Sequence, residues 1–519
     1  MEKFLVKSLA VAVMAAGLAA CGSSSSSDSD GSGRSGEVNG NISANPNFTF
    51  DQTTYVGAVD PAAATAWWDF ALDGSIPTTA AAIEVSTATA TSFDSNVTFT
   101  PSMAGITPAA DCPTGAGTYQ IVNANQDVTL DGKVFEKCIL TGSVLENLTL
   151  SNDVVWSLDA RVNVGDGNRS LTSTDNAVRD VTLTVEAGTI FHNVSKSSLV
   201  VTRGAKINAV GTEAQPIVMA GEATNNYNGV GEWGGLVLQG FGYDNNCGDP
   251  TVNTICNIDG EGDSGTFGGF DNADSSGSLQ YVVVAEAGET LQSDDELNGI
   301  GFMGVGYGTT LDYIQVHNNI DDGIELWGGA ADLKHLVLTS IKDDSIDWDE
   351  GYVGNIQYAL IIQTQNQASG AGKYHAFELD TKGDAAESAY QESNPTVANV
   401  TAIASLDAAE ALTLGDGIHL KDGSEGQFFN MLFLGDYRNC VYIKDVNVLT
   451  SYAATQDAFV NVYGLCNSAV GVGKDTNDAP IDITVDNIET ATTVLNDNLA
   501  YNVAVTANIA SKEIDGTAP

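Results

Sequence analysis

Basic side chains are scarce in this chain. It has 20 Lys and Arg against 67 Asp and Glu, which gives a formal net charge of −47 at pH 7. A surface of that sign repels phosphate backbones and anionic lipid headgroups, which argues against nucleic acid as a partner. For most of these acids the simplest explanation is a solvated surface that favours solubility. The composition also suits a salty or calcium-containing exterior.

Several motifs that carry chemistry are also missing. The chain has only five His, and it shows no HExxH, no phosphate-binding loop and no visible Ser-His-Asp arrangement. None of its seven Cys has paired CxxC spacing, which argues against a zinc–thiolate site. Few long helical patterns occur, and the chain has 55 Gly against 11 Pro. The sequence therefore predicts an all-β protein with many turns.

An apolar run lies at the N-terminus. Lys3 and Lys7 precede Leu9–Ala20, which is too short to span a bilayer as a mature helix and is typical of a signal peptide. The run ends in Leu-Ala-Ala-Cys21, which resembles the lipobox of bacterial lipoproteins. That resemblance implies that Cys21 is lipidated and anchors the chain to a membrane, and Gly22 in place of Asp favours the outer membrane. The alternative is an ordinary secretory signal with a chance Cys.

Composition divides the rest of the chain. Residues 41–110 differ in composition from the residues after them, and Pro61 begins a short helix expected over 62–70. We expect Trp67 and Trp68 to pack against the first coils of the main domain, with stacking on a sugar as the alternative. The expected segments are a signal peptide (1–20), a flexible Ser/Gly-rich tether (21–40), an accessory or capping segment (41–110), the main β domain (111–475) and a C-terminal cap or coating segment (476–519).

Six Cys remain after Cys21, and they allow fifteen pairings. An oxidising periplasm or cell surface permits disulfides. The order along the chain suggests three bonds, Cys112–Cys138, Cys247–Cys256 and Cys440–Cys466.

Two segments, 320–329 and 342–351, align without a gap at a spacing of 22 residues. A period in the low twenties is what one coil of a β-solenoid needs. If the segments are successive coils, matching residues lie about 4.8 Å apart, at the spacing of hydrogen-bonded strands. Asp321 then lies over Asp343, Asp322 over Asp344 and Glu325 over Asp347.

Later strands keep a similar spacing. Runs that start at Leu311, Leu333 and Ile356 are 22 and 23 residues apart. A second series of apolar–polar–apolar runs begins at Ile324, Ile346, Phe377, Ile418 and Val441. Alternation places one side of each run inside the solenoid and the other outside. The irregular gaps in the second series predict loops or an additional coil, and the Gly/Asn/Asp-rich residues 241–276 predict a projecting loop.

Four sequence features carry a resemblance to a known family: Leu183–Thr189, Gly204–Val218, Glu232–Leu238 and the Asp-Asp-Gly/Asp-Asp-Ser pair at 321–323 and 343–345. They look like a family of exported bacterial parallel β-helix proteins, many of them lipoproteins or surface proteins of unknown activity. The solenoid is more remotely similar to pectate lyases and polygalacturonases. The resemblance implies a right-handed parallel β-helix over roughly residues 110–470.

The aligned coils bring acids together. Stacked carboxylates repel by about 3 kcal/mol per pair at an effective dielectric near 20, so a bound cation would compensate them. Calcium takes six to eight hard oxygens, which suits this ladder. The alternatives are Asp side chains that bind turn amides and a catalytic acid pair. The expected calcium ligands are Asp321, Asp322, Glu325, Asp343, Asp344 and Asp347.

Other side chains are expected on the same outward face. His419 and Lys421 lie in an alternating run and could bind a ligand, although the Arg-x-Lys of polygalacturonases is missing. Trp327 is expected to point outward beside Glu325 as a sugar platform. For His335 and His375, we expect stacking or packing.

We therefore expect a lipid-anchored outer-membrane or cell-surface protein. Its β-helix would bind an extracellular polymer, most simply a polysaccharide, and would hold structural calcium. Long solenoid faces suit extended ligands. The first alternative is a polysaccharide lyase or glycoside hydrolase, and the second is a structural envelope protein that binds nothing.

Overall fold

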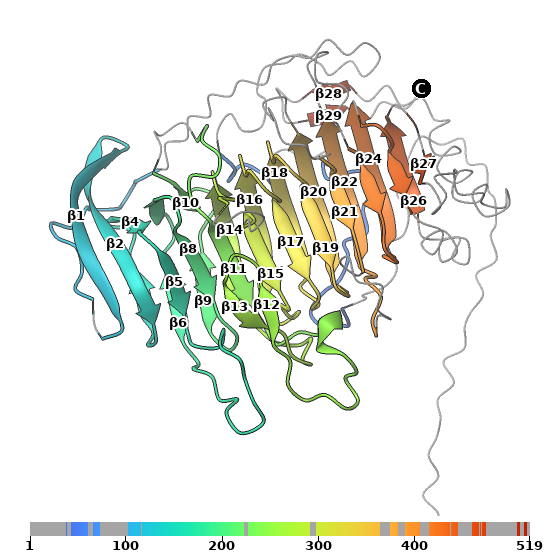
Figure 1. Cartoon of the computed structure of the whole chain (residues 1–519). Coiled ribbons are helices and arrows are strands. Elements are labelled where there is room, and N and C mark those ends of the chain that lie inside the picture. The colour runs from blue at the N-terminus through green and yellow to red at the C-terminus, as the bar shows by residue number, and fades with distance from the viewer. Residues whose placement is uncertain are drawn as a thin grey trace, which may run out of the picture. The chain divides into compact units, whose positions relative to one another are not determined.

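Short parallel strands stacked coil upon coil make up the body of the molecule (Figure 1). The computed structural model describes residues 38, 43–60, 66–72, 102–115, 117–222, 227–290, 297–363, 374–381, 390–404, 415–435, 437–444, 459–466, 468, 470–473, 506–508 and 513–515. Contacts divide the chain into two units, Met1–Ser32 and Gly33–Pro519, and every described residue belongs to the second. The expected signal peptide, Cys21 and most of 476–519 lie outside the described residues.

Two parallel ladders run the length of the solenoid. The long-strand ladder contains β4 (Val155–Leu158), β7 (Ile190–Asn193), β10 (Ile217–Gly221), β14 (Gly277–Ala285), β16 (Thr310–His317), β18 (Leu333–Thr339), β20 (Asn355–Gln363), β22 (Thr396–Ala404), β24 (Gln427–Gly435) and β26 (Phe459–Leu465). The short-strand ladder contains β5 (Arg161–Val164), β8 (Ser198–Val201), β11 (Gly235–Gln239), β15 (Ile300–Met303), β17 (Ile324–Trp327), β19 (Ile346–Asp349), β21 (Phe377–Leu379), β23 (Ile418–Leu420), β25 (Val441–Ile443) and β27 (Val470–Val472).

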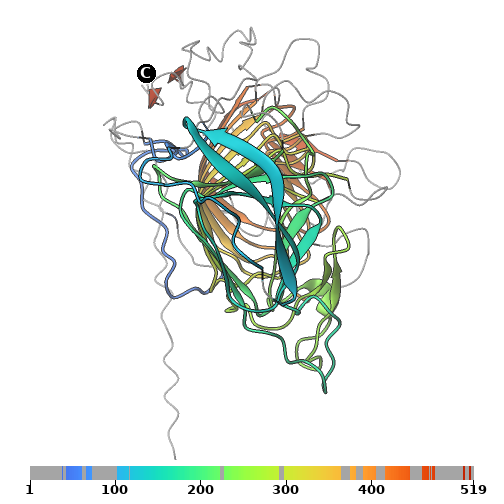
Figure 2. The ribbon, with the colours of Figure 1, turned by 90° about the vertical axis from the view of Figure 1, so that its left-hand side faces the viewer.

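The remaining strands lie at the start of the solenoid or outside it. Antiparallel β1 (Tyr119–Leu130) and β2 (Lys133–Val144) precede the coils and stand in front of them in Figure 2. The other strands are β3 (Leu148–Leu150), β6 (Thr182–Val185) and β9 (Lys206–Val210), which lead into β14, and the antiparallel pairs β12 (Ile258–Gly260) with β13 (Gly265–Phe267) and β28 (Thr506–Asn508) with β29 (Glu513–Asp515).

The register confirms the 22-residue repeat. Glu325 pairs with Asp347 and Leu326 with Trp348, in parallel strands. The runs that begin at Leu311, Leu333 and Ile356 also stack as expected. Trp348 is fully buried within the solenoid. The chain is therefore an all-β, right-handed parallel β-helix, as the sequence and its resemblance predict.

A column of left-handed residues bends the long strands. Tyr281, Tyr313, His335 and Tyr358 each have φ between 51° and 65°. Their rings stack in sequence, with centroids 4.4, 4.3 and 4.8 Å apart. Asn residues take over this position in β22, β24 and β26. Stacking of His335, expected from the sequence, is confirmed.

The outside of the long-strand ladder is apolar as well. Val218, Val283 and Val337 point away from the solenoid interior and form a second core with an N-terminal strap, residues 43–60 and 66–72. Trp68 and Phe70 of the strap are buried there, and the strap is drawn in blue in Figure 2. This face therefore needs the strap to shield it from water.

The strap differs from the sequence expectation in two ways. Residues 66–70 form a turn and no helix, whereas 62–65 lie outside the described residues. Trp67 contacts His335 at 5.1 Å, so it packs against a middle coil and not the first ones. The expectation was wrong because the strap first runs along the coils, from Asp332 beside Ser43 to β22 and β24 beneath Phe48 and Phe50. It then returns only as far as β16, where the Leu72 amide donates to Gln315. The part of the chain that the structure describes contains no helix long and apolar enough to cross a membrane.

Three disulfides join Cys112 to Cys138, Cys247 to Cys256 and Cys440 to Cys466, as the order along the chain suggests. The second closes a loop in the insertion, residues 241–276, which also contains the 3₁₀ turn η1 (Asn245–Cys247) and β12–β13.

Arg203 fastens the insertion to the coils. Its buried guanidinium donates to the carbonyls of Gly167, Cys256 and Gly268 at 2.8–3.0 Å.

Candidate functional site

Three rows of polar side chains follow the outside of the short-strand ladder from β17 to β25, and we call them the polar face. The middle row contains Glu325, Asp347, Glu378, His419 and Tyr442, which are paired in register. The corner row, three residues earlier in each coil, contains Asp322, Asp344, His375, Asp416 and Asn439. The third row, two residues after the middle row, contains Trp327, Asp349, Asp380, Lys421 and Lys444.

Local sequence explains the rows. Each strand is preceded by a polar residue and then a small or compact one, as in Asp322-Gly323 and Asp416-Gly417. The strand that comes next alternates apolar and polar residues, so every second side chain faces outward. Parallel stacking then repeats each outward position at the strand spacing.

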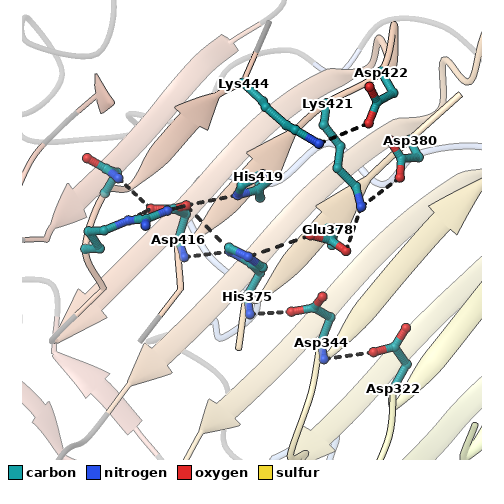
Figure 3. A network of polar contacts seen from close by, with 12 residues as sticks. Asp322, Asp344, His375, Glu378, Asp380, Asp416, His419, Lys421, Asp422 and Lys444 are labelled. Atoms are coloured by element: carbon teal, nitrogen blue, oxygen red, sulfur yellow. Dashed lines mark hydrogen bonds and ion pairs between the residues drawn. The ribbon is translucent and has the colours of Figure 1, made fainter. Parts of the chain in front are cut away.

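Corner acids bind backbone amides of the next coil. Asp322 Oδ1 accepts a hydrogen bond from the Asp344 amide at 2.9 Å, and Asp344 Oδ1 accepts one from the His375 amide. Figure 3 shows this chain of contacts from coil to coil. These two carboxylates therefore do what acids at turns commonly do, which was one of the alternatives to calcium.

The middle-row acids are placed differently. Glu325 accepts a hydrogen bond from Asn298 Nδ2 at 2.6 Å, and Asn298 also donates to Glu261 of the insertion. Asp347 Oδ1 is buried and accepts no hydrogen bond from the described residues. Asp322, Glu325 and Asp347 bring carboxylate oxygens within 4.8 Å of one another, as do Asp321, Asp322 and Asp343.

Burial determines how readily the acids around β17 and β19 ionise. It raises the pKa of Asp322, Glu325, Asp344 and Asp347 well above the ordinary range, and neighbouring acids add to the shift. Burial also raises the pKa of Asp349 to about 7, with Glu350 as the next cause. A cation would reverse this tendency because it favours the charged carboxylates.

The other end of the polar face is organised around Asp416. This fully buried carboxylate accepts hydrogen bonds from His419 Nδ1 at 3.1 Å, Arg438 Nε at 3.0 Å and Asn439 Nδ2 at 2.5 Å. Burial alone would raise the pKa of Asp416, but the bonds from His419 and Arg438 lower it to about 2. An ionised Asp416 holds the Nδ1 proton of His419, which leaves Nε2 as the basic nitrogen.

His375 has the opposite tautomer. Its Nδ1 accepts a hydrogen bond from the Asp416 amide at 2.8 Å, so its proton sits on Nε2, 3.8 Å from Glu378 Oε1. Burial, and then His419, lowers the pKa of His375 to about 3. His375, Glu378 and His419 lie close enough to hold a metal, but a protonated Nε2 on His375 has no lone pair for one.

Lys421 joins the two ends of the polar face. Its Nζ lies 2.9 Å from Glu378 Oε2 and 2.9 Å from Asp380 Oδ2. Burial raises the pKa of Asp380 to about 8 in spite of Lys421. For Glu378, burial is outweighed by Lys421 and His375, which lower its pKa. Two carboxyl groups beside one ammonium group thus shift in opposite directions, an arrangement suited to acid–base chemistry.

The structure brings most of the sequence candidates together. His419 and Lys421 lie in the same rows as the acid ladder. Trp327 does not stand free as a sugar platform: it is half-buried beside Val237, Phe267 and Met303, because the insertion packs over it. The packing expected for His375 is confirmed, because its buried ring lies 4.3 Å from that of His419, although it packs in the corner row and not within a strand.

Sequence reasoning missed His375, Glu378, Asp380, Asp416 and Arg438 as members of one site. Four of them fall outside the 22-residue spacing, because residues 364–373, 382–389 and 405–414 separate their coils. The pattern polar–small–apolar–polar–apolar, present as Asp416–Leu420 and His375–Leu379, could have found them.

Comparisons with known proteins agree with this architecture. A model of the pectate-lyase-like β-helix domain matches residues 142–511. No curated protein matches the chain. Among solved structures, the chain shows 10% identity and a TM-score of 0.14 to the Streptococcus pneumoniae surface protein and adhesin PfbA, over 64% of this chain and 86% of that one, which is too weak for any argument. The family model covers well over half of the sequence, and the chain belongs to the pectate-lyase-like β-helix family.

Proposed function

We propose that this protein is an exported β-helix that binds an extracellular polysaccharide along its polar face. The observation that carries the proposal is the register of that face: polar groups repeat over five successive coils, from β17 to β25. An extended chain of sugars can contact several coils at once. The family's likeness to pectate lyases supports a sugar polymer as the ligand.

Half-buried side chains provide the contact surface. The ring centre of Tyr442 lies 4.8 Å from that of His419, and the Arg438 guanidinium lies 5.0 Å from the ring centre of Tyr442. An aromatic ring that is fixed by its neighbours and partly exposed to water is suited to stacking against a sugar ring. The buried members, such as Asp416 and His375, hold these groups in place.

Three disulfides support export to an oxidising compartment. The lipobox-like leader supports anchoring through Cys21 at the outer membrane or cell surface. Both remain part of the proposal.

Calcium at the acid ladder completes the proposal. Asp322, Glu325 and Asp347 converge, and a buried oxygen of Asp347 has no hydrogen-bond donor among the described residues. Oδ1 of buried Asn298, beside Glu325, also lacks one. Hard, partly unsatisfied oxygens are what calcium binds. Asp321, Asp343 and Asp344 lie around these ligands.

A binding screen tests the polysaccharide. The full mature chain, with Cys21→Ser to prevent lipidation, is passed over a panel of immobilised neutral and acidic polysaccharides. We expect retention of at least one polymer and about tenfold weaker binding by Tyr442→Ala, roughly 1.4 kcal/mol. Tyr390→Ala, which changes an exposed tyrosine outside the polar face, is the matched control. Equal binding by both variants would contradict the site.

Cleavage of the polymer is the second candidate, because Asp416 orients His419 as a base beside Glu378 and Lys421. New reducing ends or unsaturated uronate would support it. In that case His419→Ala should abolish turnover and leave polymer retention within about twofold. Retention without either product favours binding alone.

Melting curves test the calcium site. A ligand of the native state at a hundredfold excess over its dissociation constant adds about 2.7 kcal/mol of stability. Chelation should therefore lower the melting temperature, and calcium should restore it. Glu325→Gln with Asp347→Asn should abolish the response, whereas Asp422→Asn, an exposed acid beside the polar face, should keep it. A wild-type curve that ignores chelator and calcium excludes the site.

A further inference from the structure

A cavity of about 480 Å³ lies outside the long-strand ladder, between the strap and the starts of β16 and β18. Its walls are formed by residues 45–49 of the strap, Ala273 of the insertion, residues 307–312 of the coils, Asp332 and Lys334. Pockets that bind small ligands have volumes of about 300–1,000 Å³. The polar face follows the short-strand ladder, so this cavity is a separate place on the molecule.

The course of the strap leaves the cavity open. One outward row of the long-strand ladder contains Asp312, Lys334 and Gln357, which are paired in register. The strap is bound along this row, because the Asp51 amide donates to Gln357 Oε1 at 2.9 Å and Lys334 Nζ donates to the Thr49 carbonyl at 3.0 Å. Among the described residues, no group of the strap bonds to Asp312, and the cavity lies at this end of the row.

The charged groups around the cavity already have partners. Asp312 Oδ1 lies 2.7 Å from His335 Nδ1, and Lys334 Nζ lies 3.2 Å from Asp51 Oδ2. Asp332 is buried and accepts hydrogen bonds at 2.7–2.9 Å from the strap and from β20. A ligand with a full charge would have to displace one of these partners, so the cavity favours a neutral ligand.

Neutral polar groups remain for such a ligand. Tyr307 is half-buried and offers both a ring and a hydroxyl, whereas Asn47 and Thr310 are exposed on opposite walls. Asp312 also keeps its second carboxylate oxygen. Sugar hydroxyls donate and accept hydrogen bonds, and a sugar ring has an apolar face, so a sugar matches these groups and the Tyr307 ring. An apolar ligand would leave the polar groups unpaired.

We propose that this cavity binds a neutral mono- or disaccharide, which bridges the strap and the coils. The Tyr307 ring stacks on one face of the sugar, while Asp312 and Asn47 bond to its hydroxyls from opposite walls. The site is separate from the polar face and does not depend on polysaccharide binding there. Because the strap forms one wall, the bound sugar also holds the strap against the outer core.

Titrations by saturation-transfer NMR test the cavity in the full mature chain with Cys21→Ser. The probes are glucose, galactose, mannose, N-acetylglucosamine, cellobiose, maltose, lactose and mannobiose, with glycine as a zwitterionic rival. We expect at least one sugar to bind. Thr310→Phe fills the cavity from an exposed position and should weaken that binding at least tenfold, as should Tyr307→Ala. Thr254→Phe, at an exposed position in the insertion, is the matched control and should bind like the wild type.

Hydrogen exchange of the strap gives a readout that a sugar bound elsewhere would not change. The amides of Asn47 and Phe48 donate to Asn45 within the strap, so they exchange when this part of the strap opens. At about ten times its dissociation constant, the sugar should slow their exchange about tenfold, because it binds only the closed strap. Thr310→Phe and Tyr307→Ala should remove this protection, and Thr254→Phe should keep it.

Three results would overturn the proposal. If no sugar of the panel binds, the cavity is not a sugar site. If glycine binds and the sugars do not, the ligand is a zwitterion. If sugar binding persists in both Thr310→Phe and Tyr307→Ala, the sugar lies elsewhere. Tyr442→Ala separates the two proposals, since it should weaken retention on polysaccharide and leave the binding of the small sugar and the protection of the strap unchanged.

Discussion

Asp416 accepts hydrogen bonds from three side chains of two successive coils, and water does not reach it. The carboxylate fixes the tautomer of His419 and neutralises Arg438. Such a buried ion is stable only while its partners are complete, because each missing partner leaves a charge without compensation.

Asp416→Asn keeps the shape of the side chain but removes its charge, which leaves Arg438 half-buried without an anion. We expect the free energy of unfolding to fall by about 3 kcal/mol, measured by denaturant titration. Asp422→Asn breaks the exposed pair with Lys444, 3.3 Å apart, and should cost less than about 1 kcal/mol. Equal losses in the two variants would show that Asp416 contributes no more than an exposed acid.

The pH dependence of this effect has a definite sign. The pKa of Asp416 falls to about 2 on folding, below its ordinary value near 3.8. Its contribution is therefore complete above about pH 4 and is lost as the pH falls toward 2. The stability difference between wild type and Asp416→Asn should shrink over that interval.

The acids of the site could be predicted from the sequence, but the residues that they contact could not. Asp321 and Asp343 lie at an uninterrupted 22-residue spacing, which the sequence shows directly. His375 and Asp416 occupy equivalent corners, but residues inserted between the coils shift their spacing to 31 and 41 positions. Their contacts depend on a register that only the folded coils define.

Among the elements, the bent strands of the long-strand ladder carry the most unusual backbone. Tyr313 and His335 adopt left-handed φ values in the middle of β16 and β18. This conformation is costly for residues other than Gly, and Asn tolerates it best. Ring stacking offsets the cost in the middle coils, and Asn399 and Asn430 avoid part of it in later ones.

Substitutions at Tyr313 separate the contribution of ring stacking from the cost of the left-handed backbone. Tyr313→Asn loses the rings on both sides but keeps a tolerated backbone, so we expect a loss of about 1–2 kcal/mol. Tyr313→Val adds the strain of a β-branched residue at φ 55° and should cost about 1–3 kcal/mol more. Denaturant titration of both variants measures the difference. A valine variant as stable as the asparagine variant would mean that the bend can relax.

The positions of the strands could be predicted from the sequence because alternation and spacing are local signals. The starts at Leu311, Leu333 and Ile356 give the ladder directly. The bend was not predictable from Tyr or His, since neither residue signals a left-handed conformation as Gly does.

In the molecule as a whole, two apolar cores lie on opposite sides of one ladder. The inner core fills the solenoid, and the outer core lies between the ladder and the strap. Alternation predicts only one buried side for each strand, so a strand that is buried on both sides, such as β20, needs a second cover. The sequence of residues 41–110 suggested a capping role but not the face that it covers.

Weakening the strap should therefore expose the outer core without unfolding the coils. Trp68 and Phe70 are almost fully buried, and Phe70 packs edge-on against Tyr281 and Tyr313. Trp68→Ser with Phe70→Ser should speed protease cleavage within residues 43–72 and increase binding of a hydrophobic dye. It should also promote self-association, because a continuous apolar strip becomes accessible. Size-exclusion chromatography with light scattering measures that association.

The control for the strap changes an apolar residue that covers nothing. Val252→Ser lies in the insertion, where its side chain is 71% exposed, and should leave cleavage, dye binding and mass unchanged. The circular dichroism of the double strap variant should stay that of a β protein, because the inner core does not involve the strap. Loss of the β signal together with strap release would show that the two cores fold as one cooperative unit. The strap would then be a structural part of the solenoid and not a cover added to a finished one.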